Sequence, residues 1–227
     1  PVVYVNSSAA VKAICGKYGG ITCTSSNAPK VCKWVFEQGK RVFFLPDQHL
    51  GTNTAHDLGL ADDKITLYDP HQVDGGLSKQ ALKKAMMIVW QGYCYVHTAF
   101  QAKNIVKARE NEPEIKVIVH PEVPKSVVRL TDSHGSTSQI RNYVDSLPDG
   151  TTVYIGTEVH FIEYLASQKK GRLSIKPLVR SMCSDMSRTN ESNLLSLLKT
   201  WSVENEINVP QAFKAPARLA LERMMAL

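Results

Sequence analysis

The chain contains two copies of one strand–helix–turn–helix–strand unit, and this repeat restricts its fold more than any other feature. The first copy begins with the apolar strand Val2-Val-Tyr-Val, passes through the hydroxyl-rich turn Thr24-Ser-Ser and ends with a strand that breaks at Pro46-Asp47. The second copy begins with Val117-Ile-Val and passes through Ser136-Thr-Ser. Strands that alternate with helices in this way predict an α/β fold with short parallel sheets.

The spacing within the two copies is nearly the same. Ser25 to Asp47 spans 22 residues, and Thr137 to Glu158 spans 21. Each copy would deliver polar groups at the same points of the topology, so the two copies could face each other across a cleft. A repeat is strong evidence for architecture and weak evidence for any particular chemistry.

Polar side chains follow the strand Val117-Ile-Val at the point where it ends. His120 and Glu122 come directly after it. In parallel α/β sheets, ligands bind just outside the carboxyl ends of the strands. We therefore hypothesise that four residues face one site: His120, Glu122, Ser136 and Thr137. The alternative for His120 or Ser136 is that each only caps a helix.

The two hydroxyl-rich turns, Thr24-Ser-Ser-Asn and Ser136-Thr-Ser, each open a predicted helix. A helix N-terminus presents free backbone N–H groups and the positive end of the helix dipole, so phosphate or carboxylate binds well there. Ser, Thr and Asn also cap helices without binding any ligand. Two related turns in a chain of net charge +6 favour anion binding over capping alone.

Length and composition exclude several classes of protein. The 227 residues, 43% hydrophobic and 21% charged, predict an ordinary folded chain of one large or two modest domains. No apolar run approaches the roughly 18 residues that a membrane span needs, so we expect no membrane partner. The basic residues are dispersed and lack interleaved aromatics, so we expect no nucleic acid. A basic balance also suits small anionic substrates.

Five scattered cysteines, in no disulfide-like framework, favour a reducing compartment such as the cytoplasm. Three of them lie on apolar stripes or in a strand and are expected in the core: Cys15, Cys23 and Cys32. Cys94 and Cys183 follow strands in loops, where packing explains them poorly. Two isolated loop thiolates could bind one soft metal centre such as an iron–sulfur cluster, with His97 as a candidate further ligand.

Seven ordered motifs carry a resemblance to a known enzyme family. They resemble quinolinate synthase at Tyr4-Val-Asn-Ser-Ser, Thr24-Ser-Ser-Asn-Ala, Leu45-Pro-Asp-Gln-His-Leu-Gly51, Gly92-Tyr-Cys-Tyr-Val-His97, Val119-His-Pro-Glu122, Gly135-Ser-Thr-Ser and Ile155-Gly-Thr-Glu158. The resemblance runs from Pro1 to the C-terminal helices. It implies three similar three-layer α/β/α domains, pseudo-symmetric around a central cavity. That cavity contains a [4Fe–4S] cluster held by three cysteines, one from each third of the chain.

By this resemblance, Cys94 and Cys183 are two of the three cluster ligands. None of the three cysteines expected in the core occupies the missing position, so the third ligand is expected upstream of Pro1. The chain also enters a strand at once, without an initiator Met, and we expect the natural polypeptide to begin earlier. The family pattern then divides the chain into a second domain at 1–97, a third domain at 98–180, and a C-terminal loop and helices at 181–227 that pack on the first domain.

The resemblance implies quinolinate synthase activity in de novo NAD biosynthesis. Enzymes of this family condense iminoaspartate with dihydroxyacetone phosphate, and quinolinate forms with loss of phosphate and water. The cluster acts as a Lewis acid through an iron that no cysteine binds. The partners are these two small molecules, with a functional link to L-aspartate oxidase or aspartate dehydrogenase. The alternative is a non-catalytic α/β module that binds a phosphosugar or another anion, which would need the hydroxyl-rich turns but no cluster.

The same resemblance gives catalytic roles to residues at the strand ends. His120 and Glu122 would transfer protons, since the pKa of histidine lies near neutrality. Tyr4 would take part in catalysis and, together with Asn6, would orient the substrate.

Other residues would hold the substrate or support the site. Ser25, Ser136 and Thr137 would bind phosphate or carboxylate at the helix N-termini. Glu158 and Asp47 are further candidates because they lie at equivalent strand ends, and structural support is the expected role of Asp47.

Overall fold

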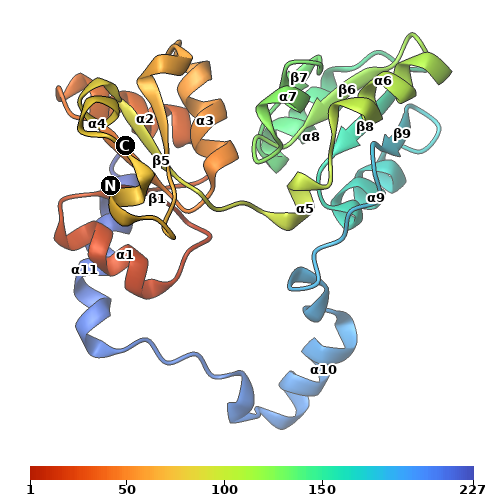
Figure 1. Cartoon of the computed structure of the whole chain (residues 1–227). Coiled ribbons are helices and arrows are strands. Elements are labelled where there is room, and N and C mark those ends of the chain that lie inside the picture. The colour runs from red at the N-terminus through yellow and green to blue at the C-terminus, as the bar shows by residue number, and fades with distance from the viewer.

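The computed structural model describes residues 1–227 and contains two α/β lobes and a C-terminal arm (Figure 1). The first lobe comprises residues 1–93 and the second comprises residues 99–180. The short helix α5 (Tyr95–Thr98) connects them. None of the helices combines the length and the apolarity that crossing a bilayer requires.

The first lobe is built on a five-stranded sheet. Its strands are β1 (Val2–Tyr4), β2 (Ile21–Cys23), β3 (Val42–Leu45), β4 (Ile65–Tyr68) and β5 (Met87–Trp90). Its helices are α1 (Ala9–Lys17), α2 (Ala28–Glu37), α3 (Gln48–Asp57) and α4 (Lys79–Lys84), with the 3-10 helices η1 (Asp62–Lys64) and η2 (Val73–Gly76). The strand order is β2-β1-β3-β5-β4, and all pairs are parallel. Apolar side chains on the central strands and on α2 and α3 form its core.

The second lobe is built on a four-stranded sheet. Its strands are β6 (Lys116–Val119), β7 (Ser133–His134), β8 (Thr152–Gly156) and β9 (Ser174–Pro177). Its helices are α6 (Ala102–Asn111), α7 (Lys125–Val128), α8 (Thr137–Ser146) and α9 (Val159–Gln168). The strand order is β7-β6-β8-β9, again with all pairs parallel. Helices cover both faces of this sheet, with a separate apolar core on each face.

The two sheets share one strand order, which confirms the predicted repeat. In the first lobe β1 lies between β2 and β3, and β5 lies beyond β3. In the second lobe β6 lies between β7 and β8, and β9 lies beyond β8. The α/β class with short parallel sheets is confirmed as well. β1 therefore corresponds to β6, β3 to β8, and β5 to β9.

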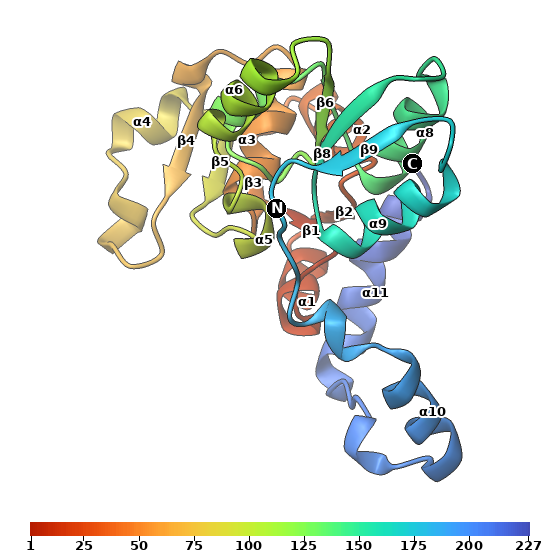
Figure 2. The same ribbon diagram turned by 90° about the vertical axis from the view of Figure 1, so that its right-hand side faces the viewer.

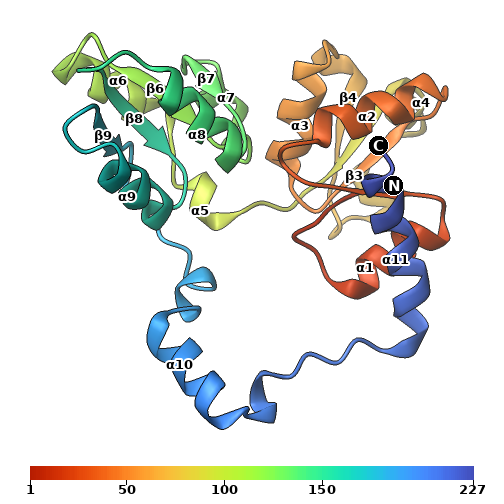
Figure 3. The same ribbon diagram turned by 180° about the vertical axis from the view of Figure 1, so that it is seen from behind.

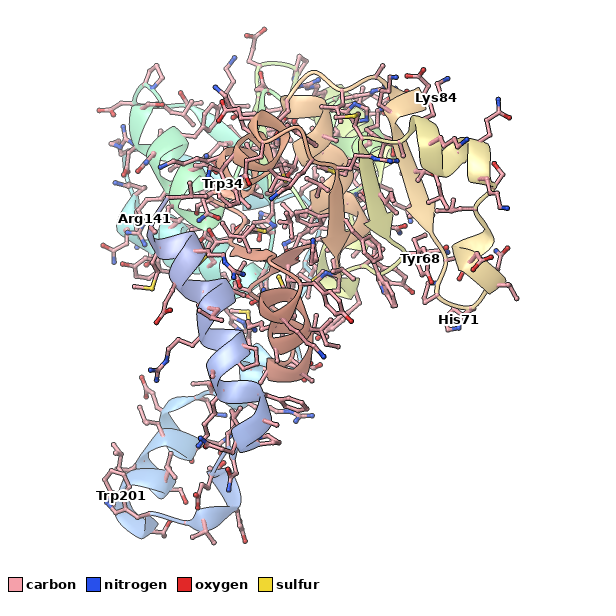
Figure 4. All side chains as sticks on the ribbon, turned by 90° about the vertical axis from the view of Figure 1, so that its left-hand side faces the viewer. Trp34, Tyr68, His71, Lys84, Arg141 and Trp201 are labelled. Carbon is pink, nitrogen blue, oxygen red and sulfur yellow. The ribbon has the colours of Figure 1, made fainter.

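The C-terminal segment leaves the second lobe and returns to the first. An arm, residues 186–210, carries η3 (Met186–Arg188), α10 (Glu191–Thr200) and η4 (Val203–Asn205), and it projects away from both lobes (Figures 2 and 3). No residue of α10 is buried. Figure 4 shows Trp201 near the far end of this arm. The long helix α11 (Gln211–Met225) then runs beside α1 (Figure 3).

Close backbone contact explains why α11 lies on α1. A Cβ added to Gly16 would lie 1.8 Å from the carbonyl oxygen of Pro216, so only glycine allows the two helices to come this near. Arg223 adds hydrogen bonds from Nη1 to the carbonyl oxygens of Gly16, at 3.2 Å, and Gly20, at 2.6 Å. The sequence named only a further domain as the packing partner of this segment, and it did not predict contact with α1. The division at 97 and 180 stays a prediction.

Candidate functional site

A cavity of about 650 Å³ opens between the lobes, at the carboxyl ends of their strands. The first lobe lines it with residues at or after the ends of β1, β3 and β5, and the second with residues that follow β6, β8 and β9. The lining side chains that can carry chemistry are Tyr4, Asn6, Asp47, Cys94, His97, Glu122, Glu158 and Cys183. Parallel α/β folds place their ligands at this end of the sheet.

The cavity gathers several of the predicted site residues but not all of them. Eight of the candidates line it: Tyr4, Asn6, Asp47, Cys94, His97, Glu122, Glu158 and Cys183. His120 lies behind Glu122, in contact with its carboxylate. Three predicted anion-binding residues do not line the cavity: Ser25, Ser136 and Thr137.

Ser136 is occupied by the cap of its own helix. Its hydroxyl accepts a hydrogen bond from the backbone N–H of Gln139 at 3.4 Å, and the Gln139 side chain accepts one from the backbone N–H of Ser136 at 2.8 Å. This reciprocal capping box takes up the backbone N–H groups of Ser136 and Gln139 at the start of α8. Anion binding by Ser136 and Thr137 therefore stays a prediction, while capping accounts for the contacts that this structure shows.

Two histidines flank the carboxylate of Glu122. His97 from α5 and His120 after β6 place their Nδ1 atoms 3.0 Å and 3.1 Å from Glu122 Oε2. The two imidazole rings stack, with centroids 4.4 Å apart and planes inclined by 16°. All three side chains are buried, and His97 Nε2 lies 3.1 Å from Thr157 Oγ1. The three groups thus form a compact array, which we call the His–Glu–His array.

Burial and contact with one another shift the pKa values of the three side chains in the His–Glu–His array. Burial favours the neutral acid, but hydrogen bonds with His120 and His97 outweigh it and lower the pKa of Glu122. Burial also opposes the charge of His97, yet the close approach of Cys94 and of the Glu122 carboxylate raises its pKa. For His120, burial and the nearby charge of His97 lower the pKa. Near neutral pH the array holds a carboxylate, a charged imidazole and a neutral one, so it can both accept and donate a proton.

Sequence reasoning named His97 only as a candidate metal ligand and missed its contact with Glu122. The spacing did carry a signal, since Cys94 and His97 lie three residues apart and share one face of a helical turn. Nothing in the local sequence places Glu122 beside them, because the contact joins α5 to the loop after β6, which lies in a different part of the chain.

Tyr4 is the last residue of β1 and lines the same cavity as Glu122 and His97. Burial and the negative charge of Glu122 raise the pKa of Tyr4, and a hydrogen bond with Ser25 partly opposes the rise. The phenol is therefore neutral and can donate a hydrogen bond to a ligand in the cavity. Asn6, two residues further along the chain, is exposed on the same side of the cavity.

Cys94 and Cys183 line the same cavity, Cys94 from the segment after β5 and Cys183 from the segment after β9. Both are partly exposed, and Cys183 Sγ accepts a hydrogen bond from the backbone N–H of Met186 at 3.4 Å. The other three cysteines are at most 1% exposed, as the sequence predicted: Cys15, Cys23 and Cys32. Those three thiols are enclosed by the packing of the first lobe and cannot join the two at the cavity.

The donors at this cavity suit a soft metal. One ligand atom each from Cys94, His97 and Glu122 lies within 4.8 Å of the other two, and Cys183 adds a second thiol on the cavity. Thiolates are the ligands that iron–sulfur clusters require, and imidazole and carboxylate also bind transition metals. The residues present therefore fit a metal centre held through two thiolates. They supply fewer thiolates than a whole iron–sulfur cluster needs.

A buried polar contact joins the lobes beside the cavity. The Asn53 side chain on α3 is 2% exposed, and its Nδ2 donates to the carbonyl oxygens of Pro121 at 2.8 Å and Val123 at 2.9 Å. These carbonyls lie on either side of Glu122 in the sequence. A helix of the first lobe thereby positions the loop of the second lobe that carries the central carboxylate.

Comparison with known proteins identifies the relatives of this chain. The family described as "Quinolinate synthetase A protein" matches residues 1–226. The chain is 44% identical to the quinolinate synthase of Corynebacterium glutamicum, 42% to that of Streptomyces coelicolor and 41% to that of Bacillus subtilis. Each comparison covers 100% of this chain and 59% to 62% of the relative. The chain thus spans less than two thirds of the length of these curated relatives.

Proposed function

The chain belongs to the quinolinate synthetase A family, and on that basis we propose that it supplies two sides of a quinolinate synthase active site. The proposed reaction condenses iminoaspartate with dihydroxyacetone phosphate to quinolinate, with loss of phosphate and water, in NAD biosynthesis. The observation that supports this most is the meeting of two thiols and the His–Glu–His array at one cavity.

Cys94 and Cys183 are the residues that would hold a [4Fe–4S] cluster, together with a third cysteine from outside these 227 residues. When bound, the cluster supplies a Lewis acid through an iron that has no cysteine ligand. His97 lies three residues from Cys94 and contacts Glu122, so it stands between a metal ligand and the proposed proton acceptor.

We assign proton transfer to the His–Glu–His array. Loss of phosphate and water from a carbon skeleton requires protons to leave carbon and to reach the departing oxygens. Glu122 lines the cavity as a carboxylate, so it is the group that we assign to proton abstraction. His97 lines the cavity in its charged form and can return a proton, while neutral His120 directs its Nδ1 at Glu122 and holds the carboxylate in place.

Tyr4 and Asn6 are proposed to orient the substrate, because both line the cavity and offer neutral hydrogen-bonding groups. The roles of Ser25, Ser136 and Thr137 in anion binding rest on the family resemblance alone. We further propose that an L-aspartate oxidase or an aspartate dehydrogenase supplies the iminoaspartate, and that the reaction takes place in the cytoplasm.

A non-catalytic anion-binding module accounts for less of the structure. Such a module would use the hydroxyl-rich turns, but Ser136 caps α8 and does not line the cavity. It would also leave unexplained why two thiols and a buried His–Glu–His array meet at the strand ends.

The test is anaerobic reconstitution, with iron and sulfide, of the natural polypeptide that carries this chain. We expect a brown protein that binds about four irons and forms quinolinate from the two substrates. Cys183→Ser should lower the iron content. Cys15→Ser is the control, because Cys15 is buried in the first lobe and its thiol donates only to backbone carbonyls. A protein that stays colourless after reconstitution would contradict the proposal.

A further inference from the structure

A carboxylate and a cysteine come together at equivalent points of the two lobes. Asp47 follows β3 and caps α3, and Glu158 follows β8 and caps α9. Cys94 follows β5 and Cys183 follows β9, the strands that pair with β3 and β8. The repeat therefore sets one acid beside one cysteine on each side of the cavity.

In the first lobe, each oxygen of Asp47 has its own backbone partner. Oδ1 accepts from the N–H of Leu50 at 2.7 Å, which caps α3, and Oδ2 accepts from the N–H of Cys94 at 3.0 Å. The carbonyl of Cys94 accepts from the N–H groups of His97 at 3.1 Å and Thr98 at 3.0 Å. Both backbone polar groups of Cys94 are therefore fixed, which limits the directions that its thiol can take.

The second lobe repeats this arrangement. Oε2 of Glu158 accepts from the N–H of His160 at 2.8 Å, which caps α9, and Oε1 accepts from the N–H of Cys183 at 3.3 Å. Oε1 also lies 2.9 Å from His160 Nδ1. The carbonyl of Cys183 accepts from the N–H of Ser187 at 3.0 Å. Cys183 is thus held by a carboxylate at its N–H and by the following turn at its carbonyl, as Cys94 is.

We propose that Asp47 and Glu158 are positioning residues for the two cysteine ligands, one in each lobe. The proposal deepens the proposed function and rests on it. Each carboxylate acts through its cysteine, because it takes up the cysteine N–H and so fixes the backbone from which the thiolate projects. Groups that orient metal ligands in this way typically contribute about 10- to 100-fold to metal affinity. The carboxylate of Glu158 also adds negative charge near Cys183, so the loss of Glu158 should raise the reduction potential of a bound cluster.

Asp47→Ser separates the two functions of this carboxylate. Serine is a good N-cap, so it can keep the bond to Leu50, but its single oxygen cannot also hold Cys94. In the reconstituted natural polypeptide, we expect this variant to release iron to a chelator about tenfold faster than the unchanged protein. Asp47→Asn should behave like Asp47→Ser, because the amide also keeps only one acceptor oxygen and cannot hold both backbone groups.

Glu158→Ser should have the same effect in the second lobe. His160→Ala is its matched control, since it removes one partner of Glu158 and leaves the bond to Cys183 in place. We expect His160→Ala to release iron at the unchanged rate. If both serine variants also do so while the unchanged protein holds its cluster, the positioning role is refuted and the proposed function stands.

Thiol reactivity gives a readout that needs no metal. Cys94 and Cys183 are the two partly exposed thiols of five, so a disulfide reagent should modify these two quickly in the folded chain. Asp47→Ser should raise the rate at Cys94 alone and Glu158→Ser the rate at Cys183 alone, each several-fold. The reason is that the loop that carries each thiol loosens, and Glu158→Ser also removes a neighbouring negative charge. Mass spectrometry of the modified peptides separates the two sites, and unchanged rates at both would overturn the proposal even if no iron is taken up.

Discussion

Replacing Asn53 by alanine should loosen the loop that carries Glu122. The lost bonds, 2.8 Å and 2.9 Å long, end on the carbonyl oxygens of Pro121 and Val123. Because Asn53 is 2% exposed, water cannot replace the donor without entering the interface between the lobes. Two buried hydrogen bonds at about 1 kcal/mol each, plus the desolvation cost of carbonyls left without partners, give a loss of about 2–4 kcal/mol. For a chain of this size, that lowers the melting temperature by roughly 5–15 °C.

Thermal melts followed by circular dichroism measure this shift, with Thr52→Ala as the matched control. Thr52 is a partly exposed neighbour on the same helix, so its replacement should cost less than about 0.5 kcal/mol. Hydrogen exchange at the amides of Glu122 and Val123 should accelerate in Asn53→Ala only. If the two variants melt at the same temperature with equal exchange rates, the bonds from Asn53 do not hold this loop.

Three further changes test other parts of the structure. Gly16→Ala should detach α11 from α1, because the added Cβ would lie 1.8 Å from a backbone oxygen, and limited proteolysis should then cut the arm faster. Gly19→Ala is its control, since its cost is backbone strain at φ +73° without any clash, and it should not release α11. In the natural polypeptide, Glu122→Gln should abolish quinolinate formation and leave the cluster absorbance intact, whereas undiminished turnover would remove Glu122 from the mechanism. Trp201→Ala should leave the melting temperature of the chain almost unchanged because the side chain is 76% exposed, and a clear fall would show that the arm is packed in solution.

Local sequence patterns were sufficient for the architecture. Hydrophobic periodicity depends only on neighbours along the chain, so the strand before His120 and the polar residues after it were predicted where the structure has them. The repeated spacing also paired Asp47 with Glu158, and both now cap helices at equivalent points of the two lobes. Each of these predictions used the sequence of one repeat alone, or a comparison of one repeat with the other.

Contacts between distant parts of the chain could not be predicted in this way. His97 meets Glu122 only because α5 packs against the second lobe, where His97 also contacts Thr157. In the sequence, Asn53 resembles any polar residue of a surface helix. The same limit applies to Ser136, for which the sequence allows both capping and anion binding. In the structure, the Gln139 side chain accepts the hydrogen bond of the Ser136 N–H, so the turn acts as a helix cap. A sequence pattern does not show where the Gln139 side chain lies.

The second lobe is joined to the first at both of its ends, through α5 and through the arm that returns as α11 on α1 (Figure 1). Both connections begin at the cavity, since Cys94 lies where the chain enters α5 and Cys183 lies where it leaves β9 for the arm. Any rotation of one lobe against the other must therefore bend the two segments that carry the thiols. The distance between the two thiols thus reports how far the lobes are open, and a metal centre bound to both would fix that angle.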